Sequence, residues 1–449
     1  MKRIKKILIN GLLDQYDYKL DLRVDERVTM IYAPNGSGKT KLLALINAVF
    51  SNDFQTLYEI PFDTIYFEFT DNTSLKVSKV IEASNEELGY LKYEIVEGEN
   101  IKYFGVNITK ALHSLNKIER RLPFLRRIAP KEWYDTISNR RLRIADILNE
   151  YEDLMDFNFD TEDENKELIK DFLNVHFIET DRLYDMGNIL INRRDSYNYH
   201  RLHDEEDTST VNVYSQEIRQ LISNALNEFA SVSQELDRTF PSRVVKKIKN
   251  SSNGKEVDSS AIINKLNKLD QHRRNLSRIG LLDNQKETFE DLTENIDHYT
   301  ASVLELYIED TVKKLSVFEE LEKNTALFLD IVNDRFGDKE LIIDKNQGFI
   351  IKLRNGRELK NANQLSSGEQ HALVMNFDLL FHSTPNTLVL IDEPEISLHI
   401  EWQQNYLSDL RKITELTGVD FIIATHSPDI MNGNWELSVP LQHSGGLHE

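Results

Sequence analysis

The sequence contains no cysteine, and this absence excludes disulfide bonds and every metal site built on thiolates. It also contains no apolar run close to the roughly 20 residues that a membrane-spanning helix needs. The first ten residues are basic and then apolar, but they are too short for a signal peptide, and Asp14 and Asp17 follow directly. We therefore interpret this start as a first strand, and we expect a cytoplasmic protein without a membrane partner.

The sequence is also poor in positive charge. With 54 Lys and Arg against 75 Asp and Glu, its formal net charge is −21, so the average field repels nucleic acid. Direct binding of DNA or RNA would need a local basic patch. One segment is basic, and two interpretations stay open: a solvated helix face paired with carboxylates, or a docking surface for an acidic partner. Its basic residues are Arg120, Arg121, Arg126, Arg127, Lys131, Arg140, Arg141 and Arg143.

A glycine-rich turn follows an apolar strand at 28–32 and leads into a helix that starts near Lys39. The turn matches the phosphate-binding loop G-x-x-x-x-G-K-[ST], with Ala33 in place of the first glycine. Glycines let backbone N–H groups close around phosphates, and a helix N-terminus favours the same negative charge. This predicts a site for the β- and γ-phosphates of ATP. The residues predicted to bind the nucleotide are Asn35, Gly36, Ser37, Gly38, Lys39 and Thr40, and the Thr40 hydroxyl is also predicted to bind Mg²⁺.

Around this loop, alternating apolar residues predict an antiparallel layer with strands over 5–10, 18–22, 64–70, 74–80 and 90–96. The pattern turns helical between Asn107 and Asn174. A core strand is expected at 175–181, and the polar residues that end it either contact the nucleotide or cap a turn. In the polar loop that follows, we interpret His200, His203 and Asp204 as solvated surface rather than a metal site.

Two long, charged runs, 212–240 and 260–335, are almost free of glycine and proline and predict paired helices in a short antiparallel coiled coil. The segment 241–258 between them predicts either a basic tip or an ordinary flexible connector. A return to strands is expected over 340–359.

A short polar stretch, LSSGEQ, precedes a predicted helix at 372–381. A helix N-terminus binds anions, so a serine hydroxyl here would either meet a γ-phosphate or only cap the helix. The residues concerned are Ser366, Ser367 and Gly368.

Two fully apolar strands end in polar residues that carry chemistry. The strand at 387–391 runs into Asp392 and Glu393, which are predicted to hold Mg²⁺ and to polarise the attacking water. The strand at 420–424 ends just before His426. In parallel sheets ligands bind at the carboxyl ends of the strands, so His426 either reaches the γ-phosphate or is only a packed histidine.

In this order, the stretches resemble those of ABC-type ATPases, in the group that includes SMC, RecF-like and OLD proteins. The resemblance covers about the first and last hundred residues. It implies an α/β head with a mixed sheet and an antiparallel β layer, interrupted by a helical, short coiled-coil insertion. In that family two subunits sandwich two ATP molecules, and the signature serine of one completes the site of the other. The resemblance assigns Lys39 and Thr40 to Walker A, and Asp392 and Glu393 to Walker B. It places Ser366 and Gly368 in the signature and Ser397–His399 in the D-loop. His426 would be the switch histidine and, as a guess, Glu179–Arg182 would be the Q-loop.

The layout of the whole chain looks like the ATPase subunit of PARIS anti-phage systems. In that family the ATPase forms a homo-oligomer and holds a Toprim-type nuclease subunit inactive. It releases the nuclease on sensing a phage anti-restriction protein, and several such triggers are acidic DNA mimics. The basic segment would then have an acidic partner.

Other interpretations remain. A stand-alone RecF-like repair ATPase would bind duplex DNA with a steep salt dependence, which the net charge disfavours. The ATPase of another two-component defence system, such as Septu, would have an HNH nuclease as its partner. A transporter subunit would give the hairpins and helices no role. The predicted coiled coil is too short for an SMC arm, there is no cysteine for a zinc hook, and we expect no Toprim domain after His426.

The 449 residues suffice for roughly two to four structural units. We expect an N-lobe of the ATPase head at 1–105, a helical insertion with the basic segment at 106–175, a core strand and mobile loop at 176–210, a helical coiled-coil region at 211–336 and a C-lobe of the head at 337–449.

Overall fold

The computed structural model describes residues 2–34, 36–81, 89–107, 122, 124–129, 132–136, 140–143, 172–178, 210–250, 258–283, 296–359 and 364–441. The chain divides into two compact units, and each is described by itself. Unit 1 comprises Met1–Glu206 and His382–Glu449, and unit 2 comprises Asp207–Phe381. This division differs from the expected domains, because residues 337–381 of the expected C-lobe belong to the helical unit.

Unit 1 contains a five-stranded sheet with the order β11-β14-β15-β3-β16, in which all neighbours are parallel. Its central strands are buried along almost their whole length, as all-apolar runs in parallel sheets usually are. The strands are β3 (Val28–Tyr32), β11 (Val175–Ile178), β14 (Leu388–Asp392), β15 (Asp420–Thr425) and β16 (Ser438–Pro440).

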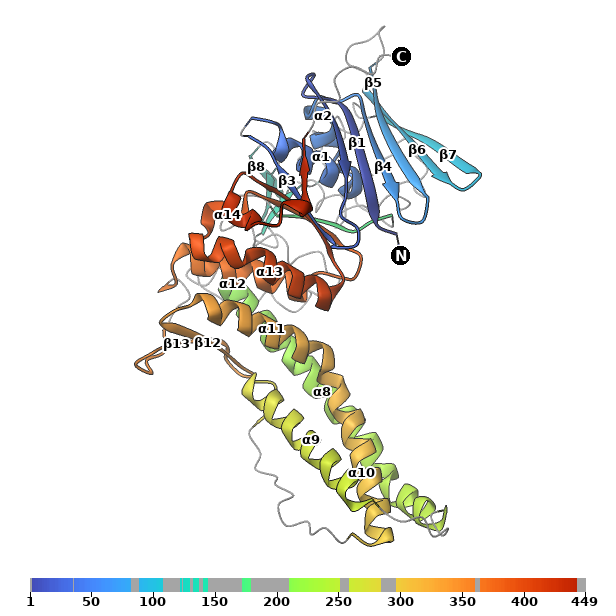
Figure 1. Cartoon of the computed structure of the whole chain (residues 1–449), viewed down its shortest axis with the longest axis vertical. Coiled ribbons are helices and arrows are strands. Elements are labelled where there is room, and N and C mark those ends of the chain that lie inside the picture. The colour runs from blue at the N-terminus through green and yellow to red at the C-terminus, as the bar shows by residue number, and fades with distance from the viewer. Residues whose placement is uncertain are drawn as a thin grey trace. The chain divides into compact units, whose positions relative to one another are not determined.

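A second sheet of unit 1 has six strands in the order β2-β1-β4-β5-β6-β7, all antiparallel (Figure 1). This is the predicted antiparallel layer. The edge strand β7 is an addition to the prediction, because most of its side chains are exposed and leave no clear alternation. The strands are β1 (Ile4–Leu12), β2 (Tyr16–Asp21), β4 (Thr64–Phe69), β5 (Ser74–Ile81), β6 (Gly89–Glu97) and β7 (Asn100–Asn107).

Helix α1 (Lys39–Ser51) supplies the core that joins these two sheets. Its buried side chains share one apolar cluster with Ile7 of β1, Phe67 of β4 and Leu390 of β14. Burial of each large apolar side chain stabilises the fold by about 1.5–3 kcal/mol, so the helix is fixed against both layers. In the described part of unit 1 the remaining helices are α2 (Phe54–Glu59), η6 (Pro394–Ser397), α13 (Ile400–Thr417), α14 (Pro428–Met431) and η7 (Trp435–Leu437).

The predicted helical insertion is wrong for the part of it that the structure describes between residues 125 and 143. A three-stranded antiparallel sheet forms there from β8 (Leu125–Ala129), β9 (Glu132–Asp135) and β10 (Arg140–Arg143). These strands have four or five residues each, and so short a stretch does not separate a period of 2 from one of 3.6.

The basic segment is described only in part. Arg126 on β8 is exposed to solvent. Arg120, Arg121 and Lys131 lie outside the described residues, and of Arg127, Arg140, Arg141 and Arg143 only the backbone is described. The two interpretations of this segment therefore both remain open.

Unit 2 consists mainly of helices and confirms the two predicted helical runs (Figure 1). Helix α8 packs along α10, and α10 also contacts α9. Their description as a coiled coil stays a prediction. The helices are α8 (Thr210–Asn250), α9 (Ser259–Arg278), α10 (His298–Leu315), η4 (Ser316–Phe318) and α11 (Glu319–Arg335). Among the described residues, no helix combines the length and the apolar character needed to cross a membrane.

Helix α8 continues through Pro241, so the predicted start of a connector at this residue is wrong. Cross-helix ion pairs accompany this continuation. Arg243 makes two hydrogen bonds with Asp310 of α10, at 2.5 and 2.6 Å, and Lys247 Nζ lies 2.8 Å from Glu309 Oε1. These basic side chains join two helices instead of forming a loop tip, while residues 251–257 lie outside the described part.

A hairpin and one further helix complete unit 2. β12 (Lys339–Asp344) and β13 (Gly348–Leu353) pair antiparallel, which confirms the predicted return to strands. Helix α12 (Ser367–Phe381) is buried on most sides, and the ring of Tyr214 stacks on Phe377 at 4.5 Å. The predicted fold class is confirmed: an α/β protein with parallel and antiparallel sheets and a helical insertion.

Candidate active site

Three strands of the parallel sheet end at one place, which we call the carboxyl edge. Thr425 of β15 pairs with Tyr32 of β3, and Asp392 of β14 pairs with Ala424 of β15. The glycine-rich loop follows β3, Glu393 follows β14 and His426 follows β15. The fold therefore brings together the three stretches of unit 1 that the sequence singles out.

The glycine-rich loop has the backbone shape that its glycines permit. Gly36 and Gly38 have φ of 83° and 77°, in the left-handed region that disfavours residues with a Cβ. Ala33 is not in that region, so alanine fits where the motif usually has glycine. The Lys39 side chain is buried and donates to the carbonyls of Ala33 and Pro34 at 2.7 and 3.1 Å. Asn35, also predicted to bind the nucleotide, lies outside the described residues.

Two tyrosines of β2 hold this loop, and the sequence interpretation did not include them. The Tyr18 hydroxyl donates to the carbonyl of Ser37 at 2.8 Å, and that of Tyr16 donates to Gly36 at 3.3 Å. Burial, with a smaller contribution from Tyr16, raises the pKa of Tyr18 to about 12, so its hydroxyl keeps its proton. The Tyr-x-Tyr spacing, which places both rings on one face of a strand, was the available signal.

Thr40 and Asp392 meet at the carboxyl edge. The Thr40 hydroxyl donates to Asp392 Oδ2 at 2.7 Å, although 352 residues separate them in sequence. Asp392 is 2% exposed. A hydroxyl and a carboxylate are hard oxygen ligands, so the pair fits Mg²⁺ once phosphate oxygens supply further ligands. The described residues hold no cluster of three or more acidic or histidine side chains that would form a separate metal site.

Glu393 adopts a strained backbone. Its φ of 44° and ψ of 58° are left-handed, and a residue with a side chain pays roughly 1–2 kcal/mol for this conformation. Its N–H donates to the carbonyl of Ala424 at 2.8 Å, which holds the strained peptide in place. Such strain persists where the surrounding structure enforces it, and it marks candidate functional residues.

His426 is 43% exposed and has two carboxylates beside its Nδ1. Glu393 Oε1 lies at 3.7 Å and Glu395 Oε1 at 3.1 Å. Glu395 was not among the predicted site residues. The signal for it was a third acid, directly after Pro394, in a stretch that already carries Asp392 and Glu393.

The signature residues lie in unit 2, at the start of α12. The Ser366 hydroxyl donates to Glu369 Oε2 at 2.9 Å and accepts from the Glu369 N–H at 3.3 Å, which is a helix cap. Lys339 Nζ contacts both oxygens of Glu369, at 2.8 and 2.7 Å. Burial alone would raise the pKa of Glu369, but bonds from Lys339 and Ser366 outweigh it and lower that pKa. Ser366 thus has a capping role, and a phosphate contact by Ser366, Ser367 or Gly368 stays a prediction.

Several other candidates fall outside the described residues. They are the Glu179–Arg182 stretch and the loop residues His200, His203 and Asp204. For Ser397 of the D-loop only the backbone is described.

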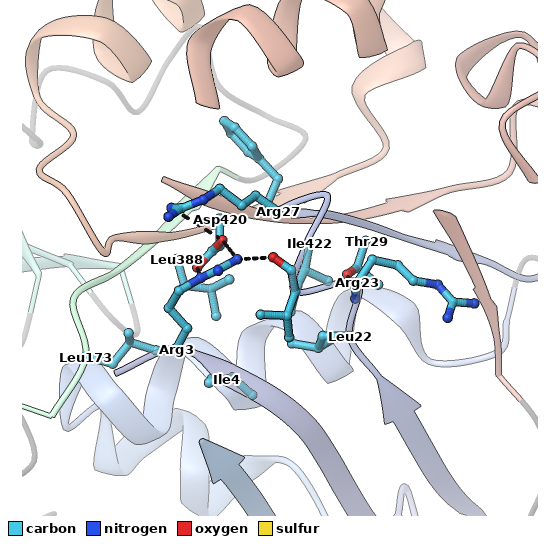
Figure 2. A pocket seen from close by; sticks show the side chains of 12 residues that line it. Arg3, Ile4, Leu22, Arg23, Arg27, Thr29, Leu173, Leu388, Asp420 and Ile422 are labelled. Carbon is cyan, nitrogen blue, oxygen red and sulfur yellow. Dashed lines mark hydrogen bonds and ion pairs between the residues drawn. The ribbon is translucent and has the colours of Figure 1, made fainter. Parts of the chain in front are cut away.

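A small pocket lies at the opposite end of the same sheet, which we call the amino edge. Arg3 and Arg27 converge there on Asp420, at the start of β15 (Figure 2). Arg3 Nε and one terminal nitrogen bind the Asp420 oxygens at 2.7 and 2.6 Å, and Arg27 lies at 3.9 Å. Because opposite charges already satisfy one another in this pocket, we assign it a structural role and no ligand.

Comparison with known proteins agrees with the chemistry of the carboxyl edge. Residues 1–431 match the family model of the AAA ATPase domain. A shorter stretch is 34% identical over 102 residues to the Retron Ec83 probable ATPase of Escherichia coli. That match covers 20% of this chain and only 17% of the length of the relative.

Two SMC head structures align along most of the chain. They are the Smc head domain with an extended coiled coil bound to the C-terminal domain of ScpA, derived from Pyrococcus furiosus, and the SMC head domain from Thermotoga maritima. The first has a TM-score of 0.38 and 14% identity over 99% of this chain and 94% of that chain. The second has 0.32 and 11% over 97% and 92%. TM-scores this low support no conclusion about function. The family model, in contrast, covers nearly the whole chain, and the protein therefore belongs to the AAA ATPase domain family and is an ATPase.

Proposed function

We propose that the carboxyl edge binds ATP with Mg²⁺ and hydrolyses it to ADP and phosphate. The observation that carries this proposal is the 2.7 Å hydrogen bond between Thr40 and Asp392. It joins the phosphate-binding loop to the acid that ends β14, so the two halves of a nucleotide site are already in contact. Thr40 and Asp392 would hold Mg²⁺, which supplies positive charge against the phosphates when bound.

The remaining roles follow from position. Lys39 would exchange its two carbonyl partners for β- and γ-phosphate oxygens, and backbone N–H groups from Gly36 to Thr40 would surround the same phosphates. Glu393, beside the end of the parallel strands, would accept a proton from the attacking water. His426 would donate a hydrogen bond to a γ-phosphate oxygen.

The variant Asp392→Asn tests whether the contact between Thr40 and Asp392 forms the Mg²⁺ site. The amide can still accept from Thr40 but has no charge for Mg²⁺, so we expect turnover to fall by roughly 100-fold or more. ATP affinity should lose most of its dependence on Mg²⁺, while affinity without Mg²⁺ changes little. Titrations of ATP with and without Mg²⁺ measure this. An unchanged Mg²⁺ dependence would contradict the proposed metal site.

We further propose that two copies pair through ATP, with the start of α12 in one copy completing the site of the other. Ser366 and Ser367 are both exposed. In unit 1, Ile396 and Ile400 follow Glu393 and are 58% and 59% exposed, which is unusual for isoleucine and suits a surface that a partner covers.

Sedimentation of Glu393→Gln with ATP tests this pairing, because slow hydrolysis keeps the paired state populated. We expect a dimer or larger species with ATP and a smaller one without it. Ile396→Asp should prevent formation of the ATP-dependent species. Its control is Ile101→Asp, a change of another exposed isoleucine on the distant edge strand β7, which should leave that species intact. Equal association in both variants would contradict the proposed surface.

For the cellular role, we propose a sensor ATPase of an anti-phage complex that sequesters a Toprim-type nuclease and releases it when an acidic phage anti-restriction protein appears. The resemblance to PARIS ATPase subunits and the local identity to a retron probable ATPase support this. Native mass spectrometry of the chain, purified from cells that carry its neighbouring gene, tests it. Several copies with a bound nuclease-like chain would support the proposal. A bare monomer or simple ATP-dependent dimer would favour a self-contained ATPase instead.

The acidic trigger would dock on the basic segment, of which Arg126 is exposed on β8. Reversing the charges of Arg126 and Arg127 should abolish triggering without changing ATP hydrolysis. Persistent triggering by that double variant would make the segment structural.

A further inference from the structure

Glu395 is an acidic residue to which no role in ATP binding or hydrolysis has been assigned so far. It lies in the short turn η6, two residues after Glu393, and its side chain is only 6% exposed. A buried carboxylate is stable only when hydrogen bonds or opposite charges compensate for the lost water. The partners of Glu395 therefore indicate what it does.

Within the described residues, the contacts of its carboxylate go to the end of one strand, β15. Glu395 Oε1 accepts from the Thr425 hydroxyl at 2.8 Å and from the His426 N–H at 2.9 Å. The same oxygen lies 3.1 Å from His426 Nδ1, closer than Glu393 at 3.7 Å. One carboxylate oxygen thus fixes both the backbone and the ring of His426.

The charge of Glu395 points to the same residue. Within the described residues, no lysine or arginine forms an ion pair with it, and its second oxygen, Oε2, is buried without a hydrogen-bond partner. His426 is therefore the one group in this part of the chain that can place a positive charge against it. A carboxylate beside Nδ1 accepts the hydrogen of that nitrogen and thereby fixes the orientation of the imidazole ring, including its other nitrogen.

A glutamine connects the same two loops without touching the ring. Gln403 on α13 donates to the carbonyl of Leu398 at 3.0 Å and accepts from the Ser427 hydroxyl at 2.7 Å. The loop after β14 and the loop after β15 are thus joined twice. Glu395 differs from Gln403 in that its contacts include His426 itself.

We propose that Glu395 is a positioning residue for ATP hydrolysis: it holds the His426 ring through Nδ1, so that Nε2 faces the γ-phosphate and Glu393 stays available for the attacking water. This inference rests on the proposed roles of His426 and Glu393. It adds the residue through which the loop after β14 fixes the position of His426.

A double-mutant cycle tests the inference with Glu395→Gln, His426→Ala and the variant that carries both. Glu395→Gln keeps an acceptor and the size of the side chain but removes the charge. We expect it to lower kcat by about 10- to 100-fold, with KM for ATP changed by less than about threefold. The double variant should be no slower than His426→Ala, because both changes remove the same contribution.

Thr425→Val is the matched control, since it removes one bond to the same oxygen, together with the bond that Thr425 accepts from the Ser427 N–H, and leaves the ring contact. It should keep kcat within about threefold of the parent if Glu395 acts through the ring. A kcat as low as that of Glu395→Gln would instead assign both residues to loop stability and overturn the inference. Effects of Glu395→Gln and His426→Ala that multiply in the double variant would overturn it as well.

The cycle also separates this inference from the proposed function. If His426→Ala hydrolyses ATP at the parental rate, the role of His426 is wrong and this inference falls with it. If His426→Ala is slow and Glu395→Gln is not, only this inference fails. Should Glu395→Gln not fold, Glu395→Asp replaces it in the cycle with the same expected pattern, because the shorter chain withdraws the oxygen from the ring while keeping the charge.

Discussion

The two ends of the parallel sheet use the same kinds of residues in opposite ways. At the amino edge, Arg3 makes two hydrogen bonds to Asp420, and Arg27 adds a second cationic group (Figure 2). At the carboxyl edge, the buried Lys39 amine donates to backbone carbonyls, although the acids Asp392 and Glu393 end a strand of the same sheet.

The difference separates stability from function. Arginine and aspartate at the amino edge compensate one another and tie β1 of the antiparallel layer to β15. At the carboxyl edge, Lys39 donates to backbone carbonyls, Asp392 accepts from the Thr40 hydroxyl, and Glu393 has a strained backbone. Backbone strain persists where the surrounding structure enforces it, and it clusters where proteins bind and react.

The largest effect is expected from Lys39→Ala at the carboxyl edge. Loss of its positive charge should weaken ATP binding and lower turnover by about 10²- to 10³-fold, with little change in thermal stability. Lys41→Ala, two residues further along the exposed side of the same helix, is the matched control. ATP titration and steady-state hydrolysis measure both. Comparable losses in the two variants would show that the loop responds to helix charge in general.

Asp420→Asn at the amino edge should have the opposite effect, a loss of stability without a loss of turnover. It leaves Arg3 and Arg27 without a negative partner in a largely buried place, so we expect the free energy of unfolding to fall by roughly 3 kcal/mol while turnover per folded molecule is unchanged. Asp21→Asn is the control, because its pair with Lys19 is more than half exposed and should contribute less than about 1 kcal/mol. Equal destabilisation would remove the distinction between buried and exposed pairs.

Glu393→Asn sharpens the comparison by relieving strain. Asparagine tolerates the left-handed region better than glutamate, so this variant should be more stable than Glu393→Gln by about 1 kcal/mol, although neither has a base. Chemical denaturation of the two variants measures the difference. Identical stabilities would mean that the conformation of residue 393 carries no strain.

Tyr18→Phe should have the smallest effect, because the hydrogen bond from Tyr18 to the glycine-rich loop joins two neutral groups. Loss of the donor to Ser37 should lower stability by about 1 kcal/mol. The folded pKa of about 12 is above the ordinary value of 10.0, so the stabilisation is complete below pH 10 and disappears as pH rises towards 12. Denaturation of parent and variant between pH 8 and about pH 11 checks this sign. A difference that grows with pH would contradict it.

The meeting of residues at the carboxyl edge could be predicted because they follow strand ends that the sequence marks by long apolar runs. Asp392 and His426 each follow such a run, and parallel strands must end together. The contact of Thr40 with Asp392 follows from the same geometry.

What the sequence left out depends on contacts between distant segments. The bonds of Tyr18 to the loop and of Glu395 to His426 require knowing which strands are neighbours. The helix through Pro241 was missed because local propensity opposes it, while pairing with α10, including Arg243–Asp310, stabilises it. The strands β8 to β10 are too short for periodicity to identify them.

The measurement that tests the account most directly is single-turnover hydrolysis of ATP by Glu393→Gln, with ATP affinity determined on the same preparation. Removal of the base should leave affinity within about threefold of the parent and slow hydrolysis by roughly 100-fold or more. Hydrolysis at the parental rate, with ATP bound, would contradict the central claim that the strained acid at the carboxyl edge activates the attacking water.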